Sequence, residues 1–325
     1  MKKALITGPF GQDGSYLCEL LTEQGYEVHG IARKPLSGNS ESIKNYLASK
    51  SIEPIVHYCD LNNYDNVKDI IKQVKSNEIY HLASTHFSSE LSTENSDQLL
   101  YLNNVSATFN ILRAANKVHQ GVKIVVAGSC LMFDASDISP QNENTLFKTK
   151  SYYGLAKMTE NQLVMFFRHK GMHVSMAIFY NHESPRRHNS FVTKKIIKNM
   201  VLVNRKKINS FDLGNLHNIK DWGYAKDYIY GVWLMAQQPE PDDYIFSTGK
   251  GHTIRDFIER TASVLGISDW QQYIKIRPEL VVRELDIDLV GDSSRAEQQL
   301  AWKHSISFNQ LVELLVKNEL SGQLD

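Results

Sequence analysis

The heptapeptide Gly8-Pro9-Phe10-Gly11-Gln12-Asp13-Gly14 is the strongest indication of fold in this 325-residue sequence. It follows a short apolar run, Ala4–Thr7, and precedes a segment, Ser15–Gln24, whose leucines recur at helical spacing. Glycines between a strand and a helix permit a tight turn and let backbone N–H groups approach a pyrophosphate at the helix N-terminus. The heptapeptide therefore predicts a dinucleotide site. The cofactor-binding residues that it supplies are Gly8, Gly11, Gln12, Asp13 and Gly14.

The choice of cofactor is indicated by the end of the second apolar run, Val28–Ala32. An NAD-selective site places an acidic residue about 20 residues beyond the glycine turn, where it accepts hydrogen bonds from the ribose 2′-OH. Here that place reads Ala32-Arg33-Lys34, with no acid. Arg33, assisted by Lys34, suits a 2′-phosphate, so the sequence favours NADP(H) over NAD(H). The alternative is that both residues are solvated surface cations.

Apolar runs and helical patterns alternate along the first half of the chain. The further runs are Ile55–Tyr58, Ile79–Ala83, Ile124–Ala127 and Val174–Tyr180, and the helical patterns are Asn66–Val74, Ala107–Val118 and Ala156–His169. This alternation predicts an α/β fold with a Rossmann-type, doubly wound parallel sheet over residues 1–180. Residues 181–325 are expected to form a smaller, mixed substrate-binding region. Helical patterns at Ile254–Leu265 and Phe308–Val316 make it mostly helical, with some elements able to cross back to the first domain.

The catalytic prediction rests on Tyr153 and Lys157, whose spacing of four places both on one face of a helix. A phenol is a poor base at neutral pH, and a nearby ammonium favours its ionised form. Tyr153 would exchange a proton with a sugar hydroxyl while hydride passes to or from the nicotinamide. Ser129, just past an apolar run, would hydrogen-bond the same oxygen. Tyr152 is five residues from Lys157 and is interpreted as a packing residue.

Composition narrows the class of protein further. The 36 Lys and Arg residues balance the 36 Asp and Glu residues, so no net charge favours nucleic acid or membrane as a partner. Cys18, Cys59 and Cys130 lack the spacing of a zinc or disulfide framework, which predicts reduced, buried thiols and no metal. No apolar run reaches the length of a signal-peptide core or a membrane span. We therefore expect a cytoplasmic protein.

Over nearly its whole length the sequence resembles the GDP-mannose 4,6-dehydratases, a family of extended short-chain dehydrogenases/reductases. The segment Asn181-His182-Glu183-Ser184-Pro185-Arg186-Arg187 is the most specific match. The other matching segments are 7–16, 25–31, 151–157, 191–195, 213–216, 221–223 and 225–228. The resemblance implies a GDP-sugar substrate and a homodimer or homotetramer, in which the segment Arg33–Ser42 reaches a neighbouring subunit's cofactor site.

The resemblance also implies roles for individual residues. Asp60 and Leu61 would border the adenine, and Ala83 would lie at the adjacent strand end. The residues implied to line the nucleotide-sugar site are Asn181, Val192, Lys195, Leu213, Asn215, Lys220 and Arg283. Lys195 would lie near the guanine. Lys220 replaces a phosphate-binding arginine of the family, which keeps the charge but loses the bidentate fork.

The sequence departs from the family pattern at Leu131. Family members have a Ser-Thr-Ser-Glu segment whose Glu removes the sugar C5 proton during loss of water, whereas this chain reads Gly128-Ser129-Cys130-Leu131. A positioned general base contributes about 10²- to 10⁴-fold, so its loss should impair dehydration and spare chemistry at C4. Cys130, or a carboxylate such as Glu90, is a candidate replacement.

Three functions follow from this departure. The favoured one is an NADP(H)-dependent oxidoreductase acting at C4 of a GDP-sugar in surface-glycan synthesis: a 4-ketosugar reductase, C4 dehydrogenase or epimerase. The second is a GDP-mannose 4,6-dehydratase with a relocated base. The third is a catalytically silent subunit that binds sugar nucleotides, although keeping Ser129, Tyr153 and Lys157 together argues against it.

Overall fold

The computed structural model describes residues 1–85, 94–280, 287–322 and 324. Within these residues a seven-stranded sheet, parallel throughout, has the strand order β10-β6-β5-β4-β1-β2-β3. Its strands are β1 (Lys3–Thr7), β2 (Glu27–Ala32), β3 (Ile55–Tyr58), β4 (Glu78–His81), β5 (Lys123–Ala127), β6 (Val174–Phe179) and β10 (Tyr244–Phe246). The order reverses between β1 and β4, and ligands bind at the carboxyl ends of strands beside such a switch point. The predicted Rossmann-type fold is confirmed.

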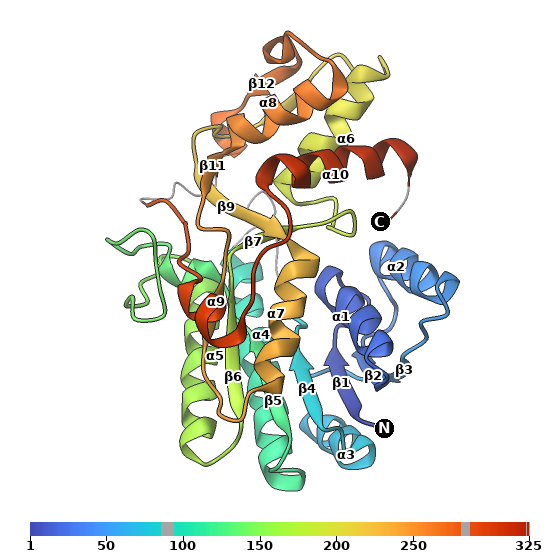
Figure 1. Cartoon of the computed structure of the whole chain (residues 1–325), viewed down its shortest axis with the longest axis vertical. Helices are drawn as coiled ribbons and strands as arrows, with labels where there is room; N and C mark the ends of the chain where they lie inside the picture. Colours follow the sequence, from blue (N-terminus) through green and yellow to red (C-terminus); the bar gives the residue numbers. More distant parts are fainter. Residues whose placement is uncertain (86–93, 281–286, 323, 325) are drawn as a thin grey trace.

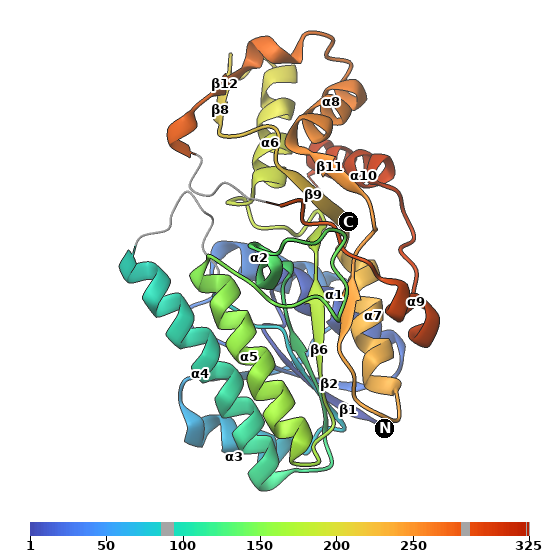
Figure 2. The same cartoon turned by 90° about the vertical axis from the view of Figure 1, so that its left-hand side faces the viewer.

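Helices cover both faces of the sheet (Figures 1 and 2). One face is covered by α1 (Gln12–Glu23) and α7 (Ala225–Gln237), which pack on each other, with α2 (Gly38–Ser49) beside α1. The other face is covered by α3 (Tyr64–Val74), α4 (Glu94–Val118) and α5 (Tyr152–His169). A separate apolar cluster lies under each layer of helices, as expected for strands buried on both faces.

The second region lies beyond the carboxyl ends of the strands (Figure 1). Its helices are α6 (Val192–Asn204), α8 (Ile254–Leu265) and α10 (Phe308–Ser321), and its strands are β7 (Asn181–Glu183), β8 (Phe211–Leu213), β9 (Ile219–Tyr224), β11 (Gly251–Thr253) and β12 (Ile274–Ile276). These elements share a third apolar cluster, centred on Trp222, Phe257 and Val312. The predicted division at residue 180 stays a prediction. Three elements from the later part of the chain, α7, β10 and α9 (Ser294–Leu300), pack on or pair with the sheet of the first region.

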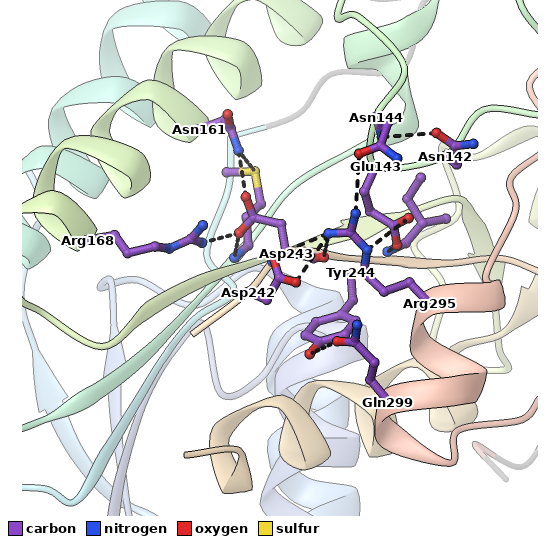
Figure 3. Close-up of polar contacts among 12 residues, drawn as sticks. Asn142, Glu143, Asn144, Asn161, Arg168, Asp242, Asp243, Tyr244, Arg295 and Gln299 are labelled. Carbon is purple, nitrogen blue, oxygen red and sulfur yellow. Dashed lines mark hydrogen bonds and ion pairs between the residues drawn. The ribbon is translucent and has the colours of Figure 1, made fainter. Parts of the chain in front are cut away.

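The exposed edge of the sheet is closed by a group of charged side chains around β10 (Figure 3). The backbone N–H of Ile245 donates to Glu143 Oε1 at 2.9 Å, and Arg295 lies 3.6 Å from the other oxygen of that carboxylate. Arg295 also pairs with Asp242, while Arg168 pairs with Asp243. Unpaired N–H groups on an edge strand invite pairing with another chain, and these side chains occupy that edge.

Several elements extend beyond their predicted limits. α4 begins at Glu94, well before the predicted start at Ala107. The sequence did not predict the first turns because they are polar and lack an apolar stripe. α2 was not predicted. Ser37 caps this helix by accepting from Ser40 N–H. The second half of the predicted subunit-bridging segment, Arg33–Ser42, forms the first turn of α2. Whether that segment reaches a neighbouring subunit stays a prediction. Within the described residues, no helix combines the length and apolarity needed to cross a membrane.

Candidate active site

A single cleft of about 900 Å³ runs along the carboxyl ends of the strands and continues against the second region. One end is lined by the glycine turn and by Arg33 and Asp60, which follow β2 and β3. Ser129, Tyr153 and Lys157 line its middle, and Asn215 and Lys220 line the far end. Strand ends and the second region therefore line one continuous cleft.

Two glycines allow the turn between β1 and α1 to close tightly. Gly8 has φ +73°, a conformation that other residues adopt at a cost. A Cβ placed on Gly14 would lie 2.1 Å from the Gly8 carbonyl oxygen. The turn closes through Gly11 N–H donating to Gly8 O at 3.0 Å, and α1 starts immediately after it. The turn fits the pyrophosphate of a dinucleotide, as the sequence predicts.

Asp13, in the first turn of α1, is neutralised by His182 from β7. His182 Nε2 lies 3.1 Å from both Asp13 carboxylate oxygens, and His182 Nδ1 lies 2.8 Å from the carbonyl oxygen of Tyr180. Both of these partners can only accept, so both ring nitrogens donate and His182 is the imidazolium. Burial lowers the pKa of His182, but Asp13 raises it by more, so the pKa is raised overall.

The two cations after β2 have different surroundings. Lys34 Nζ lies 4.0 Å from the centroid of the Tyr58 ring, in a cation–π contact. Arg33 is exposed and lines the cleft immediately after the last residue of β2. Arg33 and Lys34 therefore both line the cleft at the end of β2.

Lys157 is held rigidly below the cleft. It is 2% exposed, and its Nζ donates to Ala127 O at 2.9 Å and to Glu160 Oε2 at 3.1 Å. Burial lowers the pKa of Lys157, but Glu160 and Tyr153 raise it by more, so its pKa is raised overall. Its Nζ lies 5.6 Å from the Tyr153 ring centroid. The ammonium therefore stays charged beside the phenol.

Ser84 Oγ lies 3.4 Å from the Tyr153 hydroxyl and 3.2 Å from Asn104 Oδ1, and its single proton can be donated to only one of these two oxygens. Asn104 holds this loop twice more, accepting from Thr85 N–H and donating to Thr85 O. Neither Ser84 nor Asn104 was predicted. The position of Ser84, directly after the predicted strand Ile79–Ala83, was the signal that could have identified it, because strand ends form the site.

The segment after β5 turns into a short 3₁₀ helix, Cys130–Phe133, and Ser129 Oγ caps it by accepting from Leu131 N–H. Leu131 lines the cleft and packs against the core beneath α5. Cys130 is buried, and burial raises the pKa of its thiol to about 12. A thiol with that pKa is protonated at neutral pH, which argues against Cys130 as a replacement for the carboxylate.

The structure brings nearly all of the predicted site residues to this cleft. Those that line it are Gly8, Gly11, Gln12, Asp13, Gly14, Arg33, Asp60, Leu61, Ala83, Ser129, Tyr153, Lys157, Asn181, Val192, Leu213, Asn215 and Lys220. Lys195 lies on α6, one turn after Val192, but is not part of the lining. Arg283 and Glu90 lie outside the described residues. The binding roles of all these residues stay predictions.

One prediction about the site was wrong. Tyr152 was interpreted as a packing residue, yet it is 46% exposed. It is the first residue of α5, immediately after the N-cap Ser151, and lines the cleft mouth. A residue at the start of a helix has no preceding turn to pack against, so its position rather than its apolarity decides its exposure.

Comparison with known proteins agrees with the resemblance seen in the sequence. The sequence profile described as GDP-mannose 4,6 dehydratase matches residues 5–315. The chain belongs to the GDP-mannose 4,6-dehydratase family. Two members are GDP-mannose 4,6 dehydratase 2 of Arabidopsis thaliana, 36% identical over 98% of this chain and 87% of that protein, and GDP-mannose 4,6-dehydratase of Vibrio cholerae, 33% identical over 98% and 94%.

Solved structures share the fold of this GDP-mannose 4,6-dehydratase family member at much lower identity. The UDP-glucose 4-epimerase of Thermotoga maritima, solved with UDP-glucose, superposes with a TM-score of 0.84 at 18% identity, over 98% of this chain and 99% of that one. The dTDP-glucose 4,6-dehydratase of Bacillus anthracis, solved with NAD, gives 0.82 at 15% identity, over 98% and 96%. The chain thus has the fold of these two proteins.

Proposed function

We propose that the protein is an NADP(H)-dependent oxidoreductase that acts at C4 of a GDP-sugar, as a 4-ketosugar reductase, C4 dehydrogenase or epimerase. The proposal is supported by one observation: Leu131, at the position where the resemblance puts the family's Glu, lines the cleft together with Ser129, Tyr153 and Lys157. Groups for proton exchange at a C4 oxygen are therefore present. A carboxylate for removing the C5 proton is absent from position 131.

Each catalytic group has a distinct task in this chemistry. Tyr153 exchanges a proton with the C4 oxygen, and the Lys157 ammonium favours the ionised phenol. Ser129 donates a hydrogen bond to the same oxygen and orients it. The bound nicotinamide supplies or accepts the hydride. Ser84 Oγ, 3.4 Å from the Tyr153 hydroxyl, orients the phenol from the loop after β4.

NADP(H) is proposed because the cleft is basic where a 2′-phosphate would lie. Arg33 and Lys34 line the cleft directly after β2, and neither position is acidic. A guanidinium forms strong, often bidentate, hydrogen bonds with phosphate. An acidic residue, which would accept from the 2′-OH of NAD(H), does not occupy either position.

The second candidate is a 4,6-dehydratase, and the names of the relatives favour it. It requires a relocated base. Four carboxylates among the described residues line the cleft: Asp13, Asp60, Asp97 and Glu183. Asp13 is paired with His182, and Glu183 accepts from Thr193 and pairs with Arg187. Asp97 precedes Asn104 on α4, and the rise of an α-helix separates the two residues by about 10 Å along the helix axis.

Two incubations separate the candidates. The first contains GDP-mannose and NADP+, and the second contains GDP-4-keto-6-deoxymannose and NADPH; absorbance at 340 nm and product mass are followed in both. Consumption of NADPH with a mass gain of two hydrogens on the keto sugar is the expected result. Loss of water from GDP-mannose would instead establish the dehydratase.

The variant Leu131→Glu sharpens this test by restoring the family's carboxylate. In D2O, the wild-type protein is expected to place no solvent deuterium at C5 during simple C4 reduction. Leu131→Glu is expected to raise the rate of C5 exchange at least about tenfold above the background rate measured with the wild-type protein. The increase should be smaller than the full effect of a positioned base, because residue 131 is partly packed in the core. Leu131→Gln is the matched control, since it adds polarity without a base.

We also propose a homo-oligomer. Apolar side chains exposed on the outer faces of α4 and α5, which pack on each other, support this proposal. They are Leu99, Leu102 and Phe109 on α4 and Leu155, Met165 and Phe166 on α5. A second copy covering them would remove this apolar surface from water. Light scattering should then give at least twice the monomer mass, and a monomeric mass at assay concentration contradicts the proposal.

A further inference from the structure

A line of buried side chains runs from Lys157 away from the cleft and through the protein interior. Lys157 Nζ donates to Glu160 Oε2 at 3.1 Å, and Thr108 Oγ1 of α4 donates to the same oxygen at 2.8 Å. His81 Nε2, at the end of β4, lies 3.0 Å from Thr108 Oγ1. Glu160, Thr108 and His81 are at most 3% exposed. None of the three is part of the cleft lining.

The line continues from His81 to the glycine turn. His81 Nδ1 lies 2.8 Å from Thr7 Oγ1, and Thr7 Oγ1 accepts from the backbone N–H of Ala83 at 3.0 Å. Thr7 is the last residue of β1 and precedes Gly8. The line therefore connects the catalytic lysine with the two strand ends, β1 and β4, that border the dinucleotide end of the cleft.

The chemistry of the acceptors gives this line one direction. Glu160 accepts, so Thr108 must use its only proton on Glu160 and accept from His81 Nε2. His81 Nδ1 is then an acceptor, and Thr7 donates to it. Burial lowers the pKa of His81 to about 3, and the Lys157 ammonium lowers it as well, so His81 is neutral. Every hydroxyl and ring nitrogen in the line has a single assigned role.

Burying the Glu160 carboxylate costs free energy, and packing alone does not explain it. Its carboxylate is 1% exposed, and within the described part of the chain its Oε1 has no hydrogen-bond partner. A buried ion pair is often no more stabilising than apolar residues of the same volume, so stability alone does not explain a carboxylate here. Among the described residues, the charged group that pairs with it is Lys157, three residues earlier on the same helix.

We propose that Glu160 is a positioning residue for Lys157: it holds the ammonium in one orientation and in its charged form, and Thr108 and His81 hold Glu160 in turn. With Ala127 O and Glu160 Oε2 occupying two N–H groups of Lys157, the third is directed to the cleft that Lys157 lines. The kinetic consequence of this inference rests on the proposed C4 chemistry. The effect of Glu160 on the Lys157 ammonium does not depend on that chemistry.

The kinetic test is the variant Glu160→Gln, which keeps the size of the side chain and removes its charge. The value of kcat is expected to fall about tenfold or more, with KM for the sugar nucleotide changed less than about threefold, because a displaced catalytic group slows chemistry more than binding. The pH–rate profile is expected to move to lower pH, since the buried negative charge no longer favours protons on its neighbours. Glu160→Asp should keep the profile near its original pH even where the rate falls.

Two matched controls distinguish positioning from stability. Glu143→Gln removes a buried, ion-paired carboxylate at the edge of the sheet, and is expected to lower Tm without moving the pH profile. Thr108→Val is expected to reduce kcat by about three- to tenfold, as for loss of one hydrogen bond. Thr261→Val removes an equally buried threonine of α8, and should leave kcat unchanged. Equal effects of Glu160→Gln and Glu143→Gln on the pH profile would overturn the proposal.

A measurement without turnover separates this inference from the proposed function. Lysine labelled with ¹³C at Cε reports the titration of each ammonium by NMR, and Lys157→Met assigns the Lys157 signal. Glu160→Gln is expected to move that titration down by at least about one pH unit, because the buried ammonium loses its counter-charge. An unchanged titration contradicts the role of Glu160 whatever the enzyme acts on. A shifted titration with no turnover on any GDP-sugar contradicts only the proposed function.

Discussion

The two halves of the cleft are built differently. The expected cofactor half is made largely by backbone at the ends of adjacent parallel strands, where Gly8 and Gly14 allow a close turn that a side chain at Gly14 would open. The substrate half is made by side chains from separate elements, including Val192 of α6 and Lys220 of β9. A site made of backbone is fixed by local turn geometry. A site made of gathered side chains changes with single substitutions, which is how one fold serves different sugars.

Between the two halves lies Tyr153, and the largest effect is expected there. Tyr153→Phe removes the hydroxyl that exchanges the proton, so kcat should fall about 10²- to 10⁴-fold while cofactor affinity changes little. Tyr152→Phe is the matched control, because Tyr152 is its exposed neighbour in the same turn of α5. Steady-state kinetics and NADPH fluorescence titration measure both. Equal loss in the two variants would show that the assignment of Tyr153 is wrong.

The backbone character of the cofactor half is tested by Gly14→Ala. The added methyl would lie 2.1 Å from Gly8 O and 2.9 Å from Pro9 Cα, both backbone atoms that cannot move without opening the turn. Affinity for NADPH should fall by about a hundredfold, since the turn that approaches the pyrophosphate is displaced. Gly121→Ala is the control: its Cβ meets no atom within 4 Å, and affinity should be unchanged.

The same contrast explains what the sequence could predict. The glycine turn, the alternation of strands and helices, and the Tyr153–Lys157 pair are local patterns, and each is found where it was expected. Contacts between distant segments left no local pattern: Asn104 reaches the loop after β4 across 19 residues, and His182 reaches Asp13 across 169. α2 was missed because its polar residues give no apolar stripe. Local geometry was predictable, whereas long-range side-chain assembly was not.

A crossed pair of substitutions asks whether the two halves bind independently. Arg33→Ala should raise the Kd of NADPH about tenfold and leave that of NADH nearly unchanged, because only NADPH has the 2′-phosphate. Lys220→Ala should raise KM for the sugar nucleotide about tenfold with little effect on NADPH. Both residues are cations that line the cleft, so each is the control for the other. Loss of both affinities in either variant would mean that the halves are coupled.

The smallest expected effect concerns an ion pair between cleft residues of the two regions, His182 of β7 with Asp13 of α1. Burial lowers the pKa of His182 and raises that of Asp13, but their mutual attraction is stronger, so the pKa of His182 is raised and that of Asp13 is lowered. The His182 contribution to stability is therefore complete below about pH 6.5 and is lost as pH rises through its folded pKa. The Asp13 contribution is present above about pH 3.8 and is lost as pH falls through its folded pKa.

The same pair should make cofactor binding depend on pH. Arg187 is the other charged group that acts on both members of the pair. When His182 loses its proton, Asp13 loses its nearest counter-charge at the start of α1, beside the expected pyrophosphate. The Kd of NADPH should then rise about fivefold between neutral and alkaline pH, the size of about 1 kcal/mol of repulsion. The variant His182→Gln, whose side chain is neutral at every pH, should bind NADPH weakly and with a Kd that does not change with pH. If the Kd of this variant changes with pH as in the wild type, another group is responsible.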